Sequence, residues 1–262
     1  IKIYSKNSWG GNTTTASIVA SAFTWAKNNG ADIISNSWEA PALNSPTLNN
    51  ALNDCINNGR SGKGCVVLFS TGNNFSNTIS YPSSLPNVIA VGASDPCDHR
   101  KTAISCDNDT SWGSNYGEGL SFIAPGAQVY TTNIGGGYWY FKGTSAACPN
   151  AAGVAALVLS VNPNFTQPQV RYIMESSAEK VNPESYSYQI NPNYSSGTWN
   201  NHVGYGRVNA YRAVYTAQCI TNPSADLDLF IKDCPADVGN EPSGCIEFWD
   251  SPDIWVRNEM GT

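Results

Sequence analysis

Two unbroken apolar runs constrain the fold of this chain more than any other feature. They span residues 66–69 and 88–91, and polar or turn residues follow each of them. A strand with one face in water alternates apolar and polar side chains, whereas a strand buried on both faces is apolar throughout. The two runs therefore predict central strands of a parallel sheet with helices on both faces.

The surrounding pattern supports this α/β architecture. Periodic apolar residues predict helices over 12–29 and 46–58, both ending at Asn-Gly, with a strand at 32–37 between them. Strands alternating with helices indicate a three-layer fold in which crossover helices cover a parallel sheet. Further on, we expect strands at 119–129 and 138–142, and helices at 145–161, 166–177 and 207–217.

A serine opens the longest of these helices. Residues 143–149 read Gly-Thr-Ser-Ala-Ala-Cys-Pro and lead into an alanine-rich apolar segment. The Ser145 hydroxyl and backbone N–H would both lie at the helix N-terminus, where the helix dipole adds positive potential. That setting suits a nucleophile whose attack creates an oxyanion. The alternative is an ordinary serine cap on a buried helix.

Three separated blocks carry a resemblance to a known family. Besides 143–149, they are residues 66–73, which end in Gly-Asn and are followed by Tyr-Pro…Val-Ile-Ala-Val-Gly-Ala at 81–93, and residues 31–38. In this order and spacing they resemble the subtilisin-like serine proteases (subtilases) from about residue 1 to 217. The resemblance implies the subtilisin-like fold and a serine endopeptidase that acts on a protein or peptide substrate.

The resemblance also implies roles for particular residues. Ser145 would be the nucleophile, and its N–H and the Asn73 side-chain amide would stabilise the oxyanion; the alternative for Asn73 is a turn residue. The remaining positions would bind substrate. They are an edge strand at Ser37, Trp38 and Glu39, a pocket wall at Ser70, Thr71 and Gly72, and the pocket floor and far side at Ser80 and Tyr81.

Glu39 departs from the family pattern, which usually has glycine at this point. A side chain here could crowd the rim of the pocket, favour a basic substrate residue, or be a solvated loop acid. The small residues around it imply a roomy and mostly uncharged pocket, so we expect a broad or apolar preference.

The family's Asp and His motifs are absent from the chain. Its two histidines, His99 and His202, lie in polar segments and are expected to be loop or surface residues, and Asp32 is expected to be structural. We interpret the chain as an internal fragment that begins and ends inside strands. Without a general base the Ser145 hydroxyl is a poor nucleophile, so the fragment should be inert.

The sequence leaves two alternative functions. One is a catalytically dead subtilase-like domain used for binding or as a scaffold, which would have no need for intact Gly-Thr-Ser and Gly-Asn motifs. The other is an esterase, whose nucleophile elbow reads Gly-x-Ser-x-Gly. Ala147 stands where the second glycine of that elbow would be, which disfavours the esterase.

Composition narrows the setting. Only 13% of residues are charged, the net charge is −6, and no basic patch suggests nucleic acid as a partner. No apolar run appears long enough to span a membrane, and we expect a secreted monomer. Of the eight cysteines, local pairs read as disulfides closing short loops, whereas Cys148 should be a buried free thiol. The local pairs are Cys55 with Cys65, Cys97 with Cys106, and Cys234 with Cys245.

Cofactors and domain limits complete the expectations. The resemblance implies no required cofactor, and makes a structural calcium possible at the carbonyls of Ser83, Leu85 and Val88. A closing Gly-Tyr-Gly-x-Val-Asn-Ala motif at 204–210 places the end of the peptidase domain near 217. The pattern then changes, and residues 218–262 are expected to be a linker and the beginning of a β-rich accessory domain.

Overall fold

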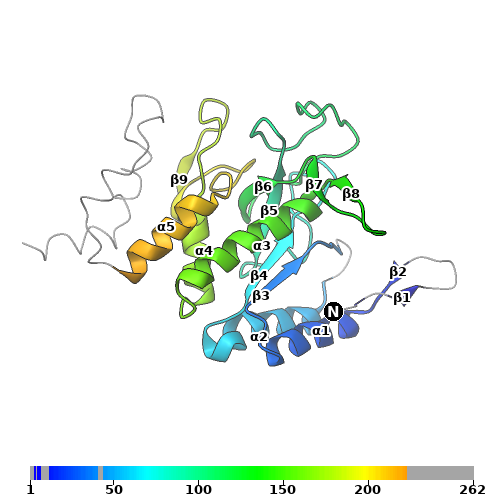
Figure 1. Cartoon of the computed structure of the whole chain (residues 1–262), viewed down its shortest axis with the longest axis vertical. Coiled ribbons are helices and arrows are strands. Elements are labelled where there is room, and N and C mark those ends of the chain that lie inside the picture. The colour runs from blue at the N-terminus through cyan, green and yellow to red at the C-terminus, as the bar shows by residue number, and fades with distance from the viewer. Residues whose placement is uncertain (1–2, 4, 7–11, 41–43, 223–262) are drawn as a thin grey trace, which may run out of the picture.

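The computed structural model describes residues 3, 5–6, 12–40 and 44–222. Within them, four parallel strands form one sheet in the order β3 (Ile33–Asn36), β4 (Val66–Ser70), β5 (Ile89–Ser94) and β6 (Leu120–Pro125). All three pairings in this sheet are parallel. The parallel α/β sheet predicted from the apolar runs is therefore confirmed (Figure 1).

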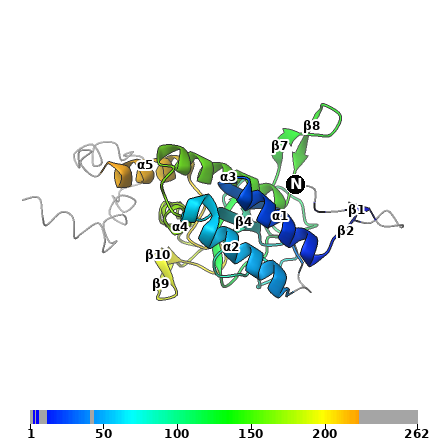
Figure 2. The ribbon, with the colours of Figure 1, turned by 90° about the horizontal axis from the view of Figure 1, so that it is seen from below.

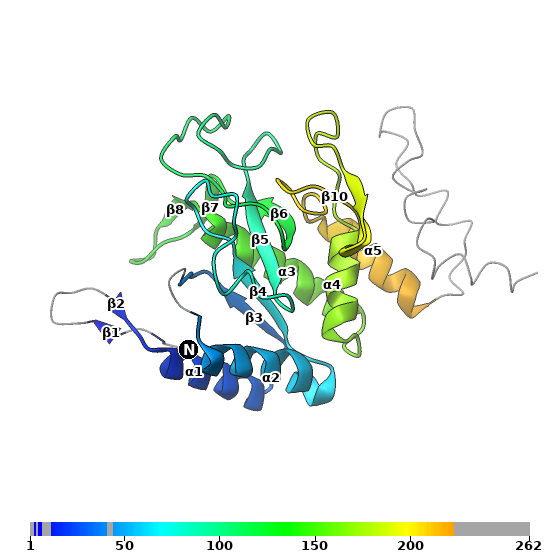
Figure 3. The ribbon, with the colours of Figure 1, turned by 180° about the vertical axis from the view of Figure 1, so that it is seen from behind.

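Helices cover both faces of the sheet. Helices α1 (Ala16–Asn28) and α2 (Pro46–Gly62) pack together on one face, as Figures 1 and 3 show. The other face carries α3 (Thr144–Val161), α4 (Gln167–Ser176) and α5 (Ala210–Thr221). The three predicted layers are present.

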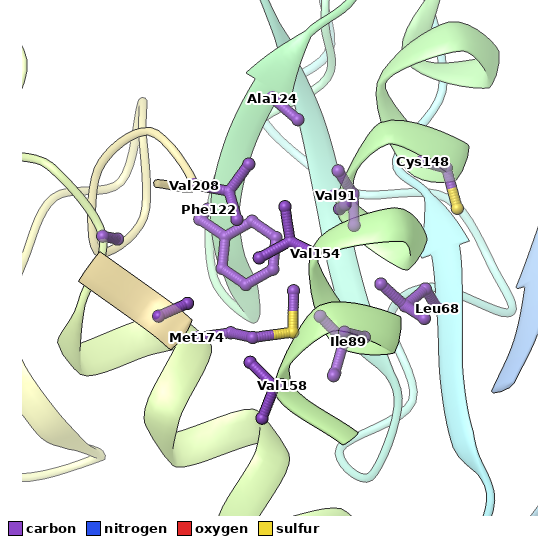
Figure 4. Packing of buried hydrophobic residues seen from close by; sticks show 14 of the residues in the cluster. Leu68, Ile89, Val91, Phe122, Ala124, Cys148, Val154, Val158, Met174 and Val208 are labelled. Carbon is purple, nitrogen blue, oxygen red and sulfur yellow. The ribbon is translucent and has the colours of Figure 1, made fainter. Parts of the chain in front are cut away.

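Strand β4 shows why its sequence is apolar throughout. Val66 and Leu68 point into the core beneath α3, where Figure 4 shows Leu68 beside Ile89 and Val158. Val67 and Phe69 point the opposite way, into the core formed with α1 and α2. Since each burial removes apolar surface from water, both layers stabilise the strand.

Helix α3 is the central helix of the larger core. By length and composition alone it is apolar enough to cross a membrane, which the sequence analysis did not expect. Just over half of its residues are nevertheless buried inside the protein. Ala147, Ala151 and Ala155 are fully buried within the core cluster on the sheet, which is the environment of a core helix.

The edges of the fold were predicted less well. The expected single strand over 119–129 is wrong, because β6 ends at Pro125 and a separate β7 (Val129–Thr132) pairs with β8 (Tyr138–Phe141). This hairpin stands out from the body in Figure 2. Two short antiparallel pairs were not foreseen. They are β1 (Ser5–Lys6) with β2 (Asn12–Thr13), and β9 (Gln189–Asn191) with β10 (Tyr194–Trp199).

Helix boundaries follow the capping residues. The Thr15 side chain caps α1, so that helix starts later than the predicted residue 12. Helical geometry in α2 is lost from Gly59, as predicted from the Asn-Gly stop. Helix α5 begins after Asn209 and continues to Thr221, beyond the predicted end at 217. The proposed accessory domain falls almost entirely on residues 223–262, outside the described part.

Arg60 joins several elements at the amino ends of the strands. Its guanidinium donates to the Asp32 carboxylate at 2.9 Å and to the carbonyl oxygens of Gly64, Phe165 and Pro163 at 3.1, 2.9 and 2.8 Å. Asp32 therefore has the structural role predicted for it. One side chain connects the end of α2, the starts of β3 and β4, and the link between α3 and α4.

The cysteines agree with expectation in part. Cys97 and Cys106 form a disulfide, and Cys148 is a buried free thiol, as predicted. Cys55 and Cys65 are instead free thiols. The Cys55 thiol donates to the Phe23 carbonyl, and the Cys65 thiol donates to the Ala31 carbonyl. The expectation of a Cys55–Cys65 disulfide is thus not met. Cys234 and Cys245 lie outside the described residues.

Candidate active site

Ser145 lies in the first turn of α3, at the carboxyl edge of the parallel sheet. The preceding Gly143 has φ of +117°, a backbone conformation that glycine adopts without strain. It brings the chain out of the β7–β8 hairpin and into the helix. Ser145 is half-buried, while its neighbours Thr144 and Ala146 are buried. The turn thus presents the serine alone toward the solvent.

The strand edge after β3 contacts the serine directly. The Ser145 hydroxyl donates to the Ser37 carbonyl at 3.5 Å, and the Ser37 hydroxyl donates to the Ser145 carbonyl at 2.9 Å. In an uninterrupted helix the Ser145 carbonyl would accept from the backbone N–H at position 149. That residue is Pro149, which has no N–H. Ser37 supplies the missing donor.

Asn73 is oriented by the same helix N-terminus. Its side-chain oxygen accepts from the Thr144 N–H at 2.9 Å and from the Thr144 hydroxyl at 3.0 Å. The Thr144 hydroxyl in turn accepts from the Gly72 N–H at 3.2 Å. With its oxygen held in this way, the amide must present its nitrogen on the opposite side. Thr144 is therefore a positioning residue, a role that the sequence analysis did not assign to it.

Two N–H donors flank one small space. A Cβ built on Gly143 would lie 3.4 Å from Asn73 Nδ2 and 3.5 Å from the Ser145 backbone nitrogen. Glycine leaves this space open, and the two nitrogens approach it from different segments. The same point is 3.6 Å from Asn73 Oδ1, so the whole side-chain amide borders the space. N–H donors held beside a reacting carbonyl group stabilise the negative charge that develops on its oxygen.

Three segments predicted to bind substrate are joined by backbone hydrogen bonds. The Ser80 N–H donates to the Thr71 carbonyl at 3.0 Å, and the Ala40 N–H donates to the Tyr81 carbonyl at 2.8 Å. The edge 37–40, the wall 70–72 and the base 80–81 are thereby joined, and their role in substrate binding stays a prediction. Ser70 is buried at the end of the wall. Tyr81 is fixed further by its hydroxyl, which donates to Asn49 at 2.8 Å.

Trp38 contributes to this frame through its backbone. Its ring packs edge-on against Phe69 with centroids 5.2 Å apart, and its indole N–H donates to Asn36 at 3.3 Å. The side chain therefore belongs to the core on the α1 and α2 face. Any contact of residue 38 with an extended substrate would come from its backbone, as on the edge strands that bind peptides.

Asn115 was not identified from the sequence, yet it holds the pocket together. It is 1% exposed, and its amide nitrogen donates to the Thr71 carbonyl at 3.1 Å and to the Ser80 hydroxyl at 3.3 Å. Its oxygen accepts from the N–H groups of Asn74 and Ser76. No motif surrounds Asn115, so only the folded structure reveals this role.

The two histidines lie in other surroundings. The His202 ring stacks on Tyr116 with centroids 4.5 Å apart, and burial lowers its pKa. His99 lies beside Tyr186, at 6.1 Å between centroids. Within the described part of the chain, neither is a hydrogen-bond partner of Ser145. This agrees with the prediction that both are loop residues.

The predicted calcium ligands are backbone carbonyls. The Leu85 carbonyl already accepts from the Val88 N–H at 3.2 Å, and Ser83 is buried with its hydroxyl bonded to the Ser80 carbonyl. A carbonyl oxygen has a second lone pair and can still bind a hard cation. Among the residues that the structure describes, no group of three or more His, Cys, Asp or Glu side chains could hold a metal.

A serine at a helix N-terminus, with two N–H donors beside it at the carboxyl edge of a parallel sheet, is typical of an α/β serine hydrolase. Comparison with known proteins makes the class specific. The model of the subtilase family, Peptidase S8, matches residues 1–206. The chain therefore belongs to the subtilase family of serine-type endopeptidases.

Relatives and solved structures agree with this assignment. A thermophilic serine proteinase of Bacillus sp. strain AK1 is 36% identical over 200 residues, covering 76% of this chain and 42% of the relative. A calcium-dependent protease of Trichormus variabilis is 33% identical over 256 residues, covering 82% and 36%. A protease from Pseudoalteromonas arctica has a similar structure, with a TM-score of 0.62 and 26% identity, covering 79% and 60%. The chain thus spans about two fifths of these two curated relatives.

Proposed function

We propose that the protein to which this chain belongs is a secreted serine endopeptidase that cleaves peptide bonds through an acyl-enzyme on Ser145. The observation that supports the proposal is the position of Asn73 Nδ2 and the Ser145 backbone nitrogen, which lie 3.4 and 3.5 Å from one point, the place of a Cβ built on Gly143. Peptide hydrolysis requires a nucleophile and a site for the oxyanion side by side, and this edge of the sheet supplies both.

The reaction would proceed in two stages. The Ser145 oxygen attacks the carbonyl carbon of the scissile bond, and the carbonyl oxygen becomes an oxyanion in the space flanked by Asn73 and Ser145. Collapse of this intermediate releases the amine product and leaves an ester on Ser145. Water then attacks the ester and repeats the sequence, which frees the acid product and restores the hydroxyl.

The general base is proposed to come from outside these 262 residues. Ser145 Oγ donates to a backbone carbonyl, and both histidines of the chain lie against tyrosines. A carbonyl cannot take up the serine proton, so the hydroxyl needs an additional partner to become nucleophilic. The 262-residue chain alone is accordingly proposed to be inert, with the Asp and His of the triad on another part of the protein.

Labelling with a fluorophosphonate probe tests the function, because such probes react with activated serines. The protein encoded by the complete gene should be labelled at Ser145, its Ser145→Ala variant should not be, and the isolated 262-residue chain should remain unlabelled. Casein hydrolysis by the complete protein should follow the same pattern. A complete, folded protein that neither reacts with the probe nor cleaves casein would favour the dead subtilase-like binding or scaffold domain.

Calcium is proposed as a structural ion only. Two relatives bear the name calcium-dependent protease, and the carbonyls of Ser83, Leu85 and Val88 are candidate ligands of this chain. These residues lie on the loop that follows the pocket base at Ser80 and Tyr81. Chelation should therefore lower the melting temperature, and added calcium should restore it.

Secretion is supported by the disulfide between Cys97 and Cys106, since such bonds persist in oxidising compartments. Relatives named as bacterial subtilisins point the same way. Fractionation of the source cells, followed by detection of the protein in the medium, tests this part of the proposal.

A further inference from the structure

We propose that Glu39 makes the pocket selective for a basic side chain, arginine or lysine, on the substrate residue that precedes the cleaved bond. This inference names the substrate class of the proposed endopeptidase and rests on that function. It replaces the broad or apolar preference expected from the small residues of the pocket.

The position of the carboxylate carries the inference. A Cβ built on Gly72 would lie 2.4 Å from Glu39 Oε2, 2.4 Å from Asn115 Nδ2 and 2.7 Å from Ser80 Oγ. Gly72 is in the pocket wall and Ser80 is in its base. The Glu39 side chain thus reaches across from the edge strand and ends between the wall and the base. Glu39 is an exposed residue, so its carboxylate meets solvent at the rim as well as the atoms of the wall and the base.

Gly72 makes this arrangement possible. Its φ of +101° lies in the region that favours glycine, and any side chain there would meet all three polar atoms. The Glu39 carboxylate therefore lies in the space that a side chain at residue 72 would fill. A basic side chain of the substrate would reach the carboxylate there with its polar head.

The charge of the pocket matches such a head. Besides Glu39 Oε2, the atoms nearest to a Cβ built on Gly72 belong to the Asn115 amide and the Ser80 hydroxyl, and both of these groups are neutral. Asn115 Nδ2 already donates to Thr71 and Ser80. Across the described residues, no lysine, arginine or histidine forms an ion pair with Glu39. A guanidinium or ammonium entering the pocket would supply the missing positive partner.

The chemistry of the pair favours a charged substrate over a neutral one of the same size. A carboxylate accepts charge-assisted hydrogen bonds from guanidinium, in which both partners gain from their opposite charges. An apolar side chain would instead have to displace water from the carboxylate without offering it any donor. The same residue therefore attracts basic side chains and rejects apolar ones.

The first test uses the complete protein and peptide substrates that differ at a single residue. Arginine before the scissile bond is compared with citrulline, which has nearly the same shape without the charge, and with leucine. We expect kcat/KM for arginine to exceed that for citrulline by about 10-fold to 100-fold. Glu39→Gln should abolish this ratio, whereas Glu184→Gln, which removes an exposed carboxylate elsewhere, should preserve it.

The second test does not depend on turnover. The fluorescent aromatic amidine p-aminobenzamidine is titrated into the Ser145→Ala variant of the complete protein and into the Ser145→Ala, Glu39→Gln double variant. The fluorescence change gives the dissociation constant of each complex. Binding should weaken about tenfold or more when Glu39 is changed. Because citrulline removes the charge from the substrate, the comparison remains decisive even if the Glu39 variant fails to fold.

Each outcome has one meaning. Cleavage of leucine and citrulline substrates as fast as the arginine substrate overturns the inference and leaves the proposed endopeptidase intact. Absence of cleavage with every substrate counts against the proposed function, and amidine binding then decides the inference by itself. Glu39-dependent binding supports a pocket for cations, and binding that is unaffected by Glu39→Gln overturns it.

Discussion

The Ser37 hydroxyl donates to the Ser145 carbonyl oxygen at 2.9 Å, and this is the carbonyl that Pro149 leaves without a helical donor. A proline in the second turn of α3 would ordinarily cost the helix one hydrogen bond. Here the hydrogen bond from Ser37 replaces the lost helical bond, and it connects the predicted substrate-binding edge to the helix that carries the nucleophile. The position of Ser145 is therefore defined by β3 as well as by α3.

We predict that Ser37→Ala destabilises the protein by about 1–2 kcal/mol, because it removes the donor of a hydrogen bond and leaves the carbonyl unpaired. In a Pro149→Ala background the backbone N–H of residue 149 can donate to the Ser145 carbonyl. The loss of unfolding free energy caused by Ser37→Ala should therefore be smaller in that background. Urea unfolding of the two single variants and the double variant measures this coupling. Ser160→Ala, which loses a hydroxyl bonded within α3, is the control. Equal costs of Ser37→Ala in both backgrounds would contradict the link.

Thr144→Val should lower kcat about tenfold with little change in KM. The variant keeps the shape of the side chain but loses the hydroxyl that bonds to Asn73 and Gly72. Asn73→Ala should be more severe, because loss of one oxyanion donor typically costs about 100-fold to 1000-fold in kcat. Thr144→Ser, which keeps the hydroxyl, should retain most activity. Steady-state kinetics on the complete protein checks the ranking; a larger loss for serine than for valine would refute the positioning role.

Gly143→Ala should abolish turnover while allowing the protein to fold. The added methyl would lie between Asn73 Nδ2 and the Ser145 nitrogen, in the space proposed for the oxyanion. The backbone strain itself should cost about 1–3 kcal/mol. Gly135→Ala is a matched control, since Gly135 also has positive φ, at +94°, but has nothing within 4 Å of an added Cβ. If both variants lose activity equally, strain and not occupation of the space is the cause.

The layers of this fold follow from local sequence signals, and the expected elements are found where those signals are strong. Apolar runs identify β4 and β5, and the side chains of Thr15, Ser45, Thr166 and Asn209 cap the four helices that begin after them. The β9–β10 hairpin escaped prediction because its apolar residues are too few and too far apart. In β10 only Tyr194 and Trp199 pack against the core, and five positions separate them, so no alternation of apolar and polar residues can be detected.

The sequence predicts the chemical groups of the candidate site but not the residues that hold them in place. Ser145 and Asn73 belong to recognisable motifs, whereas Asn115 acts through bonds to residues more than 30 positions away. The orientation of Glu39 depends on Gly72 and Ser80, which lie near it only in the folded chain. Such long-range contacts have no signature in a single sequence.

Thiol labelling should distinguish the cysteines by burial. Burial raises the pKa of Cys148 to about 11, so little reactive thiolate is present near pH 8. In the native protein iodoacetamide should modify Cys148 far more slowly than the partly exposed Cys219, and in urea both should react. Peptide mass spectrometry gives the extent of labelling at each site. Rapid native modification of Cys148 would show that α3 is less tightly packed than described.

Acid should weaken the contact between Glu179 and Arg207. Burial is the largest single effect and raises the pKa of Glu179. The hydrogen bond with Arg207, the charges of Arg207 and Arg212 and the hydrogen bond with Asn209 together outweigh it and hold the pKa below the usual 4.5. A lowered pKa in the folded state stabilises the protein above the pKa of the unfolded state. That stabilisation is lost as the pH falls through the folded-state value. Glu179→Gln should therefore flatten the decline of unfolding free energy below about pH 4.5, whereas Glu184→Gln should leave it steeper. Parallel declines in the two variants would contradict the assignment.

The clamp formed by Arg60 has an evolutionary consequence. It joins α2, β3, β4 and the α3–α4 link at the amino ends of the strands, whereas the pocket and the serine lie at the carboxyl ends. Mutations that change the pocket are distant from Arg60, so they should not alter the contribution of the Arg60 hydrogen bonds to the free energy of unfolding. A lineage with this division can try new residues at positions such as Glu39 with little risk of unfolding. New cleavage preferences thereby become accessible through single substitutions.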